Sequence, residues 1–242
     1  MQKYNFVIPA RAGSKRIIKK NIRMIAGKPL LGWTIEKIKS FQICENIFVS
    51  TDSLEIAEIA QDFGAKVPFL RPKNLADDHT STLEVMKYSV NEFFQTETKD
   101  SITICVYPAS FFLEENWLKT ALSKASREVW EFVFAGAEQN HSPYRSFRKS
   151  DDGSLDFLFP DHISSRSQEL PRSYVDAALF YVGKNENWLQ AKQIISPRST
   201  FIRVPMLSSL DLNTPEDWDL FEILFESRNK IQNLLRSPNE SR

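Results

Sequence analysis

A basic loop near the start of the chain carries the residues best suited to bind phosphate. Small residues alternate with cations in Pro9–Arg16 (PARAGSKR), directly after a short apolar run. Small residues let backbone amides approach a phosphate closely, whereas an arginine can bind two phosphate oxygens and a lysine adds a point charge. This loop therefore predicts a phosphate-containing ligand.

The charge distribution supports this prediction. The whole chain has a formal net charge of zero, yet residues 1–35 contain no Asp or Glu. The cations of this segment are Lys3, Arg11, Lys15, Arg16, Lys19, Lys20, Arg23 and Lys28. A local positive field attracts polyanions. The balanced total charge, and the lack of aromatic residues interleaved with these cations, argue against nucleic acid as the partner.

The loop differs from two widespread phosphate-binding motifs. A Walker loop places Lys and then Ser or Thr directly after its second glycine, whereas here Gly13 is followed by Ser14 and then Lys15. The dinucleotide fingerprint needs three spaced glycines, and only Gly13 is present in this loop. The ligand must therefore be inferred from other parts of the chain.

Strand and helix patterns alternate along the chain. Short apolar runs predict strands over Tyr4–Pro9, Asn46–Ser50, Lys66–Leu70, Ser101–Tyr107 and Phe132–Ala135, with returning strands over Ser173–Gly183 and Phe201–Val204. Apolar residues at helical spacing predict helices over Lys28–Phe41, Ser53–Phe63, Thr82–Phe94, Glu114–Ala125 and Pro215–Leu235.

This alternation predicts an α/β fold with a mainly parallel sheet flanked by helices, of the Rossmann-like nucleotide-binding type. Ligands of such sheets bind beyond the carboxyl ends of the strands, so the loops after Ile8, Val49 and Val106 are expected to surround one crevice. We expect a single domain over residues 1–236 and a frayed tail over 237–242. The strand and helix pattern degrades after residue 138, and residues 139–185 are expected to form a lid or a dimerisation segment.

Composition and sequence patterns limit the class of protein and its expected location in the cell. The apolar runs are strand-length and interrupted by charge, which argues against a membrane partner. Cys44 and Cys105 lie in or beside strand-like runs and predict buried thiols rather than a disulfide framework or a zinc site. The N-terminus does not show the pattern of an export signal. We therefore expect a cytoplasmic protein.

In its motifs the chain resembles the acylneuraminate cytidylyltransferase family, whose members activate sialic acids and related nonulosonic acids. The family pattern Pro-Ala-Arg-x-Gly-Ser-Lys, Lys-Asn-Ile and Gly-Lys-Pro-Leu is matched by Pro9–Lys15, Lys20–Ile22 and Gly27–Leu30. The likeness continues through Val49–Asp52, Glu55–Ala57, Gly64-Ala65, Pro68–Pro72, Leu75–Thr82, Arg166–Pro171 and Asp211–Asp217.

Later motifs resemble the branch of this family that uses pseudaminic acid. These are Tyr107–Ala109 and the run Arg166–Pro171, followed by Tyr174, Asp176-Ala177 and Phe180-Tyr181. Two places depart from that branch: Val175 replaces a histidine, and Ala178-Leu179 replaces Gly-Gln. They lie where the family holds the acidic sugar.

The resemblance implies a nucleotide-diphospho-sugar transferase type of fold and a reaction with CTP as co-substrate. The anomeric hydroxyl of a nonulosonic acid, pseudaminic acid first of all, would attack the α-phosphorus of CTP and release pyrophosphate. The alternatives are the same reaction on N-acetylneuraminic or legionaminic acid, and a non-catalytic nucleotide-binding homologue. The resemblance also implies a homodimer.

The resemblance implies functional roles for individual residues. It implies catalytic roles for Arg11, Lys20 and Asp211. It implies nucleotide binding by Ala10, Arg11, Gly13, Ser14, Lys15, Lys20, Asn21, Arg71, Thr80, Ser81 and Thr82. The candidates for binding the sugar are Tyr107, Arg166, Gln168, Tyr174 and Asp176.

A magnesium site is implied at Asp211 and Asn213. The family pattern Asp-x-Asp-Thr supplies two carboxylates on one side of an extended segment, and oxygen ligands suit Mg²⁺. Here the second carboxylate is replaced by the amide of Asn213, which brings no negative charge. We therefore expect Asp211 to be the main protein ligand, with Asn213 acting directly or through water, and we expect weaker metal binding.

Overall fold

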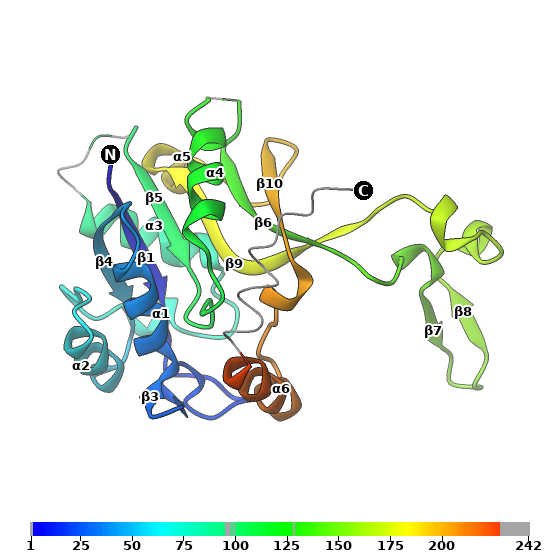
Figure 1. Cartoon of the computed structure of the whole chain (residues 1–242), viewed down its shortest axis with the longest axis horizontal. Coiled ribbons are helices and arrows are strands. Elements are labelled where there is room, and N and C mark those ends of the chain that lie inside the picture. The colour runs from blue at the N-terminus through cyan, green and yellow to red at the C-terminus, as the bar shows by residue number, and fades with distance from the viewer. Residues whose placement is uncertain (1, 95–97, 99, 128, 228–242) are drawn as a thin grey trace.

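The computed structural model describes residues 2–94, 98, 100–127 and 129–227, which form a central sheet between layers of helices (Figure 1). The six-stranded sheet has the order β10-β6-β9-β5-β1-β4. Its strands are β1 (Tyr4–Pro9), β4 (Cys44–Ser50), β5 (Ile102–Val106), β6 (Phe132–Glu138), β9 (Tyr174–Lys184) and β10 (Ser199–Val204).

Five of these strands run in the same direction and one runs against them. β1 is parallel to β4 and β5, and β6 is parallel to β10. β9 is antiparallel to both of its neighbours, β5 and β6. The mainly parallel sheet is thus confirmed. The central positions of β1 and β5 are buried, as expected of strands that are covered on both faces.

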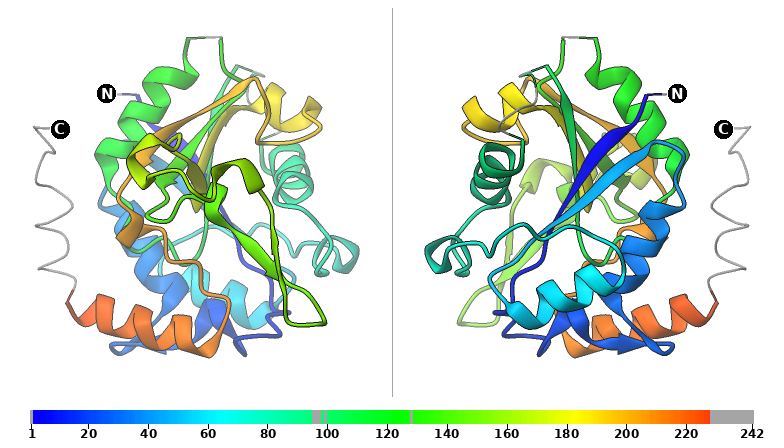
Figure 2. Two further views of the ribbon diagram at one scale, coloured as in Figure 1. Left: turned by 90° about the vertical axis from the view of Figure 1, so that its right-hand side faces the viewer. Right: turned by 90° about the vertical axis from the view of Figure 1, so that its left-hand side faces the viewer.

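Helices cover both faces of the sheet (Figure 2). One face packs against α1 (Leu30–Lys39) and α4 (Glu115–Ala125) through a large apolar cluster that includes Ile8, Leu31 and Leu118. The other face packs against α3 (Thr82–Phe93) and α5 (Asn185–Gln190) through a cluster that includes Met86, Cys105 and Trp188. α2 (Leu54–Asp62) follows β4.

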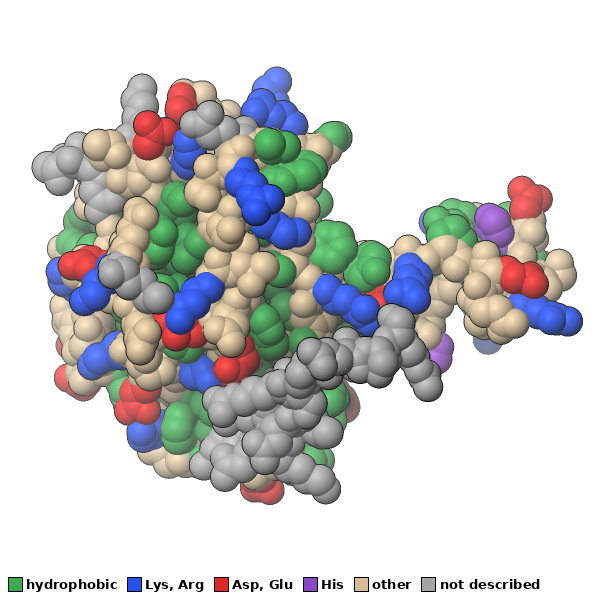
Figure 3. Space-filling view, turned by 45° about the horizontal axis from the view of Figure 1, so that its top comes forward, with side chains coloured by type: hydrophobic (Ala, Val, Ile, Leu, Met, Phe, Trp, Pro, Cys, Tyr) green, Lys and Arg blue, Asp and Glu red, His purple; other side chains and the backbone are tan. Residues whose placement is uncertain are grey.

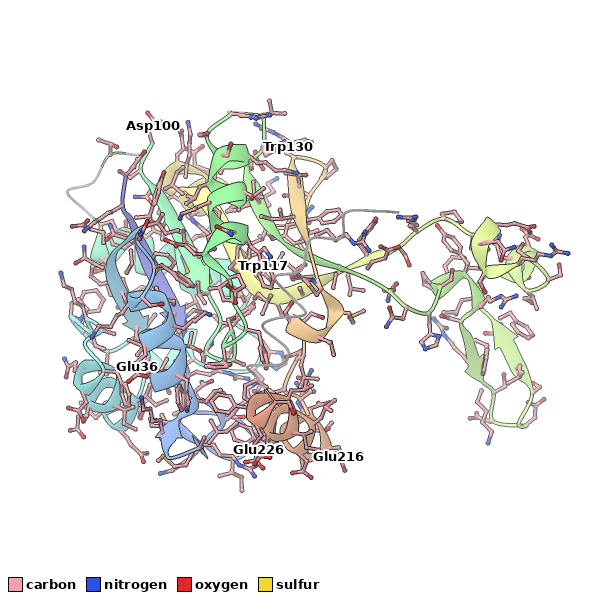
Figure 4. All side chains as sticks on the ribbon, in the orientation of Figure 1. Glu36, Asp100, Trp117, Trp130, Glu216 and Glu226 are labelled. Carbon is pink, nitrogen blue, oxygen red and sulfur yellow. The ribbon has the colours of Figure 1, made fainter. Side chains whose placement is uncertain are left out.

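The last described helix, α6 (Pro215–Glu226), closes the carboxyl edge of the sheet. Its two ends are marked by Glu216 and Glu226 in Figure 4. Trp218, Phe221 and Phe225 of α6 form a third apolar cluster with residues of the basic loop region, among them Ile17 and Ile25. Burial of large side chains in this cluster ties the C-terminal helix to the N-terminal loop.

Residues 139–173 leave the body as a projecting excursion. It contains the small hairpin of β7 (Phe147–Lys149) and β8 (Leu155–Phe157), which stands clear of the sheet in Figure 1. Figure 3 shows the same part as an arm that projects from the body. The chain then returns as β9. The segment expected over 139–185 therefore divides into an excursion and a strand of the central sheet.

Most expected elements lie within a few residues of their predicted bounds, but one strand was predicted wrongly. In the run Lys66–Leu70, only Lys66 pairs, in an isolated bridge with Phe48. Pro68 and Pro72 lack the amide protons that a ladder needs, so the chain leaves the sheet here. The amide of Arg71 instead donates to the carbonyl of Thr51, which fixes the path beside the crevice.

Other differences are small. α1 begins two residues late because β3 (Lys28–Pro29) first pairs with β2 (Met24–Ile25). The stretch 228–235 of the predicted C-terminal helix and the tail 237–242 lie outside the described residues. Cys44 and Cys105 are free thiols, and Cys105 is fully buried. In the described part of the chain, no helix has the length and apolar character needed to cross a membrane.

Candidate functional site

A two-compartment cleft lies at the carboxyl edge of the sheet, where the loops after β1 and β5 meet. The larger compartment has a volume of about 1010 Å³ and the smaller one about 820 Å³, both including space that is open to solvent. Both are lined by Arg11, Lys20 and Asn21, so these three residues stand at their junction. The loops after Ile8 and Val106 meet at one crevice, as expected, whereas the turn after Val49 lines neither compartment and contacts the basic loop through Asp52.

Cations line the smaller compartment. Arg11, Ser14, Lys15, Arg16 and Lys20 all face it. The carboxylate of Asp78 bridges two of them: its Oδ1 lies 2.7 Å from Arg11 Nη1 and its Oδ2 lies 2.5 Å from Lys15 Nζ. Hydrogen bonds from Lys15 and Arg11 lower the pKa of Asp78 to about 2, so it remains an anion at neutral pH. Asp78 thus occupies a position suited to a phosphate group.

The basic loop is held in shape by hydrogen bonds to its backbone. The buried side chain of Asn21 donates from Nδ2 to the carbonyl of Arg11 at 2.9 Å. Asp52, at the end of β4, accepts from the amide of Ala12 at 2.9 Å. These contacts fix the backbone at Arg11 and Ala12, while the ion pair with Asp78 holds the Arg11 side chain. Sequence reasoning assigned no role to Asp52 or Asp78, although both lie in runs that match the family pattern.

Lys20 connects the loop to the segment before α6. Its Nζ donates to the carbonyl of Leu212 at 2.8 Å. Burial lowers the pKa of Lys20, because the charged form loses solvation. The same lysine faces both compartments, so its ammonium group can reach a ligand that spans them.

The larger compartment combines apolar walls with a few polar groups. Arg71 is only 4% exposed, and its Nε has no hydrogen-bond partner among the described residues. Burial lowers the pKa of Arg71, yet a guanidinium remains charged at any physiological pH. A buried donor without a partner is costly, and because Arg71 lines the larger compartment its N–H is available to an acceptor that enters there.

The polar residues around the start of α3 differ in what their side chains contact. Thr80 and Thr82 line the larger compartment. Ser81 instead caps α3: it accepts from the Glu84 amide at 3.2 Å, and its hydroxyl donates to the Glu84 carboxylate at 2.7 Å. The hydroxyl of Thr82 contacts that of Tyr107 at 2.5 Å.

The expected metal ligands lie beside each other, but they are not equally available. Asp211 lines the larger compartment. Asn213 donates from Nδ2 to Asp211 Oδ2 at 2.6 Å, while its own oxygen accepts from Arg16 Nη2 at 2.6 Å. The oxygen of Asn213 is thus already used by a cation. No cluster of three or more His, Cys, Asp or Glu side chains suited to a metal occurs in the described part of the chain.

The expected sugar-binding residues are only partly brought together. Tyr107 lines the larger compartment, and Asp176 accepts a hydrogen bond from Tyr181 behind it. Tyr174 instead packs its ring on Phe201, with centroids 4.8 Å apart. Arg166 and Gln168 belong to the projecting excursion and line neither compartment.

Ala178, two residues after Asp176, has a strained backbone conformation. Its φ is +48°, in the left-handed region that costs a residue with a side chain about 1–2 kcal/mol. Ala178 lines the larger compartment, and it is one of the two positions at which the chain departs from the family pattern, which has glycine. Strain at a cleft wall is typical of functional sites.

Two further residues expected to bind the nucleotide, Ala10 and Gly13, line neither compartment. Ala10 is buried, and its amide continues the β1 ladder by donating to the carbonyl of Ser50. Gly13 has no atom closer than 4.0 Å to the position of a Cβ, so its surroundings are open. Neither residue lines the cleft with a side chain, and both leave room for a ligand to approach the backbone.

Comparison with known proteins agrees with this geometry. Residues 5–149 match the sequence profile of the family described as cytidylyltransferase. The chain is 35% identical, over 91% of its length and 95% of the relative, to the pseudaminic acid cytidylyltransferase of Campylobacter jejuni strain 81-176. It is 32% identical, over 91% of its length and 95% of the relative, to the CMP-N,N'-diacetyllegionaminic acid synthase of Legionella pneumophila.

Solved structures support the fold. The structure of CMP:2-keto-3-deoxy-manno-octonic acid synthetase complexed with CTP superposes with a TM-score of 0.69 at 16% identity, covering 94% of this chain and 100% of that one. A 4-diphosphocytidyl-2C-methyl-D-erythritol synthase superposes with a TM-score of 0.63 at 12% identity, covering 93% and 100%. The chain therefore has the fold of these nucleotide-using enzymes.

Proposed function

The chain belongs to the cytidylyltransferase family, and from this premise we propose that it transfers CMP from CTP to pseudaminic acid with release of pyrophosphate. The observation that carries the proposal is the junction of the two compartments at Arg11 and Lys20. A nucleoside in the larger compartment would place its triphosphate on the cations of the smaller one. The two residues would then lie beside the phosphates between which the bond breaks.

The reaction needs positioning and charge neutralisation more than a covalent intermediate. The anomeric hydroxyl oxygen of the sugar forms a bond to the α-phosphorus of CTP, and the bond from that phosphorus to the bridging oxygen breaks. Negative charge then builds on the departing pyrophosphate. Arg11 and Lys20 would stabilise this charge, because fixed cations in a partly buried site act more strongly than solvated ones.

The other residues at the cleft have matching roles. Ser14 and Lys15 would contact the β- and γ-phosphates, once the phosphates displace the Asp78 carboxylate from Lys15. Asn21, Arg71, Thr80 and Thr82 would surround the cytidine. Tyr107 would face the sugar from the end of β5. We retain Ala10 and Gly13 as backbone contacts, whereas Ser81 acts through the cap of α3.

We propose Mg²⁺ as the cofactor, held mainly by Asp211. The fit is partial: Asp211 offers a carboxylate at the cleft, but the oxygen of Asn213 is taken by Arg16. Phosphate oxygens and water would have to supply the remaining ligands, which suits an ion that keeps several waters. When bound, the ion would neutralise phosphate charge. Asn213 would orient Asp211 through its amide hydrogen bond.

We also propose that the protein acts as a homodimer joined through the excursion. Several large apolar side chains are exposed there, including Phe147 at 55% and Leu155 at 51%. Figure 3 shows hydrophobic side chains on this projecting part. Arg166 and Gln168 do not line the cleft of their own chain, so they could contribute to sugar binding only at the cleft of a partner.

Residues 1–236 are proposed to form one nucleotidyltransferase domain that works in the cytoplasm. The single-domain proposal is supported by the sheet, which includes strands from Tyr4 to Val204, and by α6, which packs on the N-terminal loop. The two free cysteines suit a reducing compartment.

The proposed reaction is tested by a panel of sugars. Purified protein is incubated with CTP, Mg²⁺ and either pseudaminic, legionaminic or N-acetylneuraminic acid, and pyrophosphate release is measured against a sample without sugar. We expect pseudaminic acid to give a kcat/KM at least about tenfold above the others. Preference for another sugar would contradict the substrate, and CTP binding without turnover on any sugar would support a non-catalytic homologue.

The metal proposal is tested by titrating activity with Mg²⁺. Asp211→Ala should remove most activity at every Mg²⁺ concentration, because the protein then offers no carboxylate at this position. Asn213→Asp should lower the Mg²⁺ concentration needed for half-maximal activity, because it adds a negative ligand. The exposed Asp219 on α6 supplies the control Asp219→Ala, which should behave as wild type. An unchanged titration in Asp211→Ala would refute this assignment.

The homodimer is tested by sedimentation equilibrium. We expect twice the 28.0 kDa mass of the single chain. Phe147→Asp combined with Leu155→Asp should shift the mass towards the monomer, because charges at these positions oppose burial of the hairpin. Leu54→Asp, at another exposed leucine (68%) on α2, should not shift it. A monomeric wild-type protein would rule out this arrangement.

A further inference from the structure

The proposed reaction gives no role to Arg16, although this residue lines the smaller compartment. Its Nη2 donates to Asn213 Oδ1 at 2.6 Å, and Asn213 Nδ2 donates to Asp211 Oδ2 at 2.6 Å. A guanidinium can only donate and an ionised carboxylate can only accept, so both neighbours require the same orientation of the Asn213 amide. The three side chains therefore form a bridge from the basic loop to the segment before α6.

The two ends of this bridge are fixed by the burial of neighbouring residues. Ile17 and Leu212 are both buried, and both belong to the third apolar cluster, which also contains side chains of α6. Lys20 adds a hydrogen bond to the carbonyl of Leu212. Arg16 itself is exposed, and a long exposed side chain has many conformations open to it. The hydrogen bond to Asn213 therefore restricts where the Arg16 guanidinium lies.

The amide of Asn213 holds Arg16 without compensating its charge. Two other cations of the smaller compartment, Arg11 and Lys15, share the carboxylate of Asp78. Arg16, in contrast, makes no ion pair among the described residues, and the side chain that accepts its hydrogen bond is neutral. The full charge of this guanidinium is therefore available to an anion that enters the smaller compartment.

An aspartate in place of Asn213 would not leave this charge available. It would form an ion pair with Arg16, and it would also repel Asp211, because two carboxylates at this distance disfavour each other. Asp217 does not take the place of such a partner. Hydrogen bonds from the amides of Asn213 and Thr214 lower the pKa of Asp217, and the charge of Arg16 adds to this effect. Its carboxylate is engaged in capping α6.

We propose that Arg16, held by Asn213, binds the phosphates that leave as pyrophosphate and neutralises part of their charge without a metal ion. This inference rests on the proposed function, because it needs a triphosphate that spans the two compartments. Arg16 lines only the smaller compartment, where the β- and γ-phosphates are proposed to lie. Its hydrogen bond to Asn213 uses one of three guanidinium nitrogens, which leaves the others to bind phosphate oxygens. Arg16 contacts the substrate, and Asn213 is a positioning residue.

The test measures the affinity for inorganic pyrophosphate by isothermal titration calorimetry, with EDTA present so that no metal ion contributes. Arg16→Gln should weaken pyrophosphate binding about tenfold, because it removes a charge-assisted hydrogen bond. Arg16→Lys should lie between this variant and the wild type, since it keeps the charge but loses the planar guanidinium. The matched control is Arg23→Gln: the Arg23 guanidinium lies over the ring of Trp218, outside the smaller compartment, and its loss should change the affinity little.

Variants of Asn213 test the positioning role in the same assay. Asn213→Asp should weaken metal-free pyrophosphate binding, because the new carboxylate pairs with Arg16, and added Mg²⁺ should restore part of the affinity. Asn213→Ala should weaken binding by a smaller factor, since it frees the guanidinium without neutralising it. Combined with Arg16→Gln, however, Asn213→Ala should have little further effect, because its influence passes through Arg16. Thermal unfolding checks that each variant is folded, and Arg16→Lys carries the test if Arg16→Gln is not.

The possible outcomes separate this inference from the proposed function. Unchanged metal-free pyrophosphate affinity in Arg16→Gln would overturn the inference. An effect of Asn213→Ala that is just as large in the Arg16→Gln background would overturn it too, because Asn213 would then act independently of Arg16. Wild-type protein that binds CTP with Mg²⁺ but binds no pyrophosphate in EDTA would likewise contradict it. Absence of CTP binding by the wild type with Mg²⁺ would instead overturn the proposed function itself.

Discussion

The candidate site depends on an excess of positive charge at the carboxyl edge of the sheet. Arg11, Lys15 and Lys20 converge there from one loop, and Asp78 partly neutralises them. Solvent screens ion pairs that are this exposed, so Asp78 stabilises the loop only weakly. A ligand with several phosphate charges can therefore replace it at low cost. We propose that the site exchanges the Asp78 carboxylate for the phosphates of a ligand.

The fold keeps these cations in place without a ligand. β1 lies inside the sheet and is buried along its centre, so the loop that follows it has a fixed origin. Contacts from Asn21 and Asp52 shape the loop, and the third apolar cluster holds α6 against it. Lys20 then bonds to the segment before α6. Preorganised cations need little rearrangement when charge develops during phosphoryl transfer, which is where such sites gain most of their effect.

The sequence predicted the parts of this arrangement that depend on local pattern. Strand and helix periodicity predicted the alternation of elements and therefore the shared edge, and the run around Arg11 contains most of the cations that line the smaller compartment. The sequence did not predict contacts between segments that are distant in the chain. β9 was expected only as a returning strand, because nothing local reveals that it inserts antiparallel between β5 and β6. The ion pair between Asp78 and Arg11 and the edge-to-face ring contact between Tyr181 and Tyr107 likewise join residues far apart in the chain. The predicted strand at Lys66–Leu70 did not form because Pro68 within it and Pro72 just after it outweigh its apolar character.

The most direct measurement of the central claim is the affinity for CTP when the charge of the smaller compartment is changed in opposite directions. Asp78→Asn removes the internal anion and should tighten CTP binding several-fold at low salt, whereas Arg11→Ala should weaken it at least about tenfold. Glu55→Gln removes the same charge from an exposed ion pair with Lys19 and should have little effect. Weaker binding in Asp78→Asn, or unchanged binding in Arg11→Ala, would contradict the account.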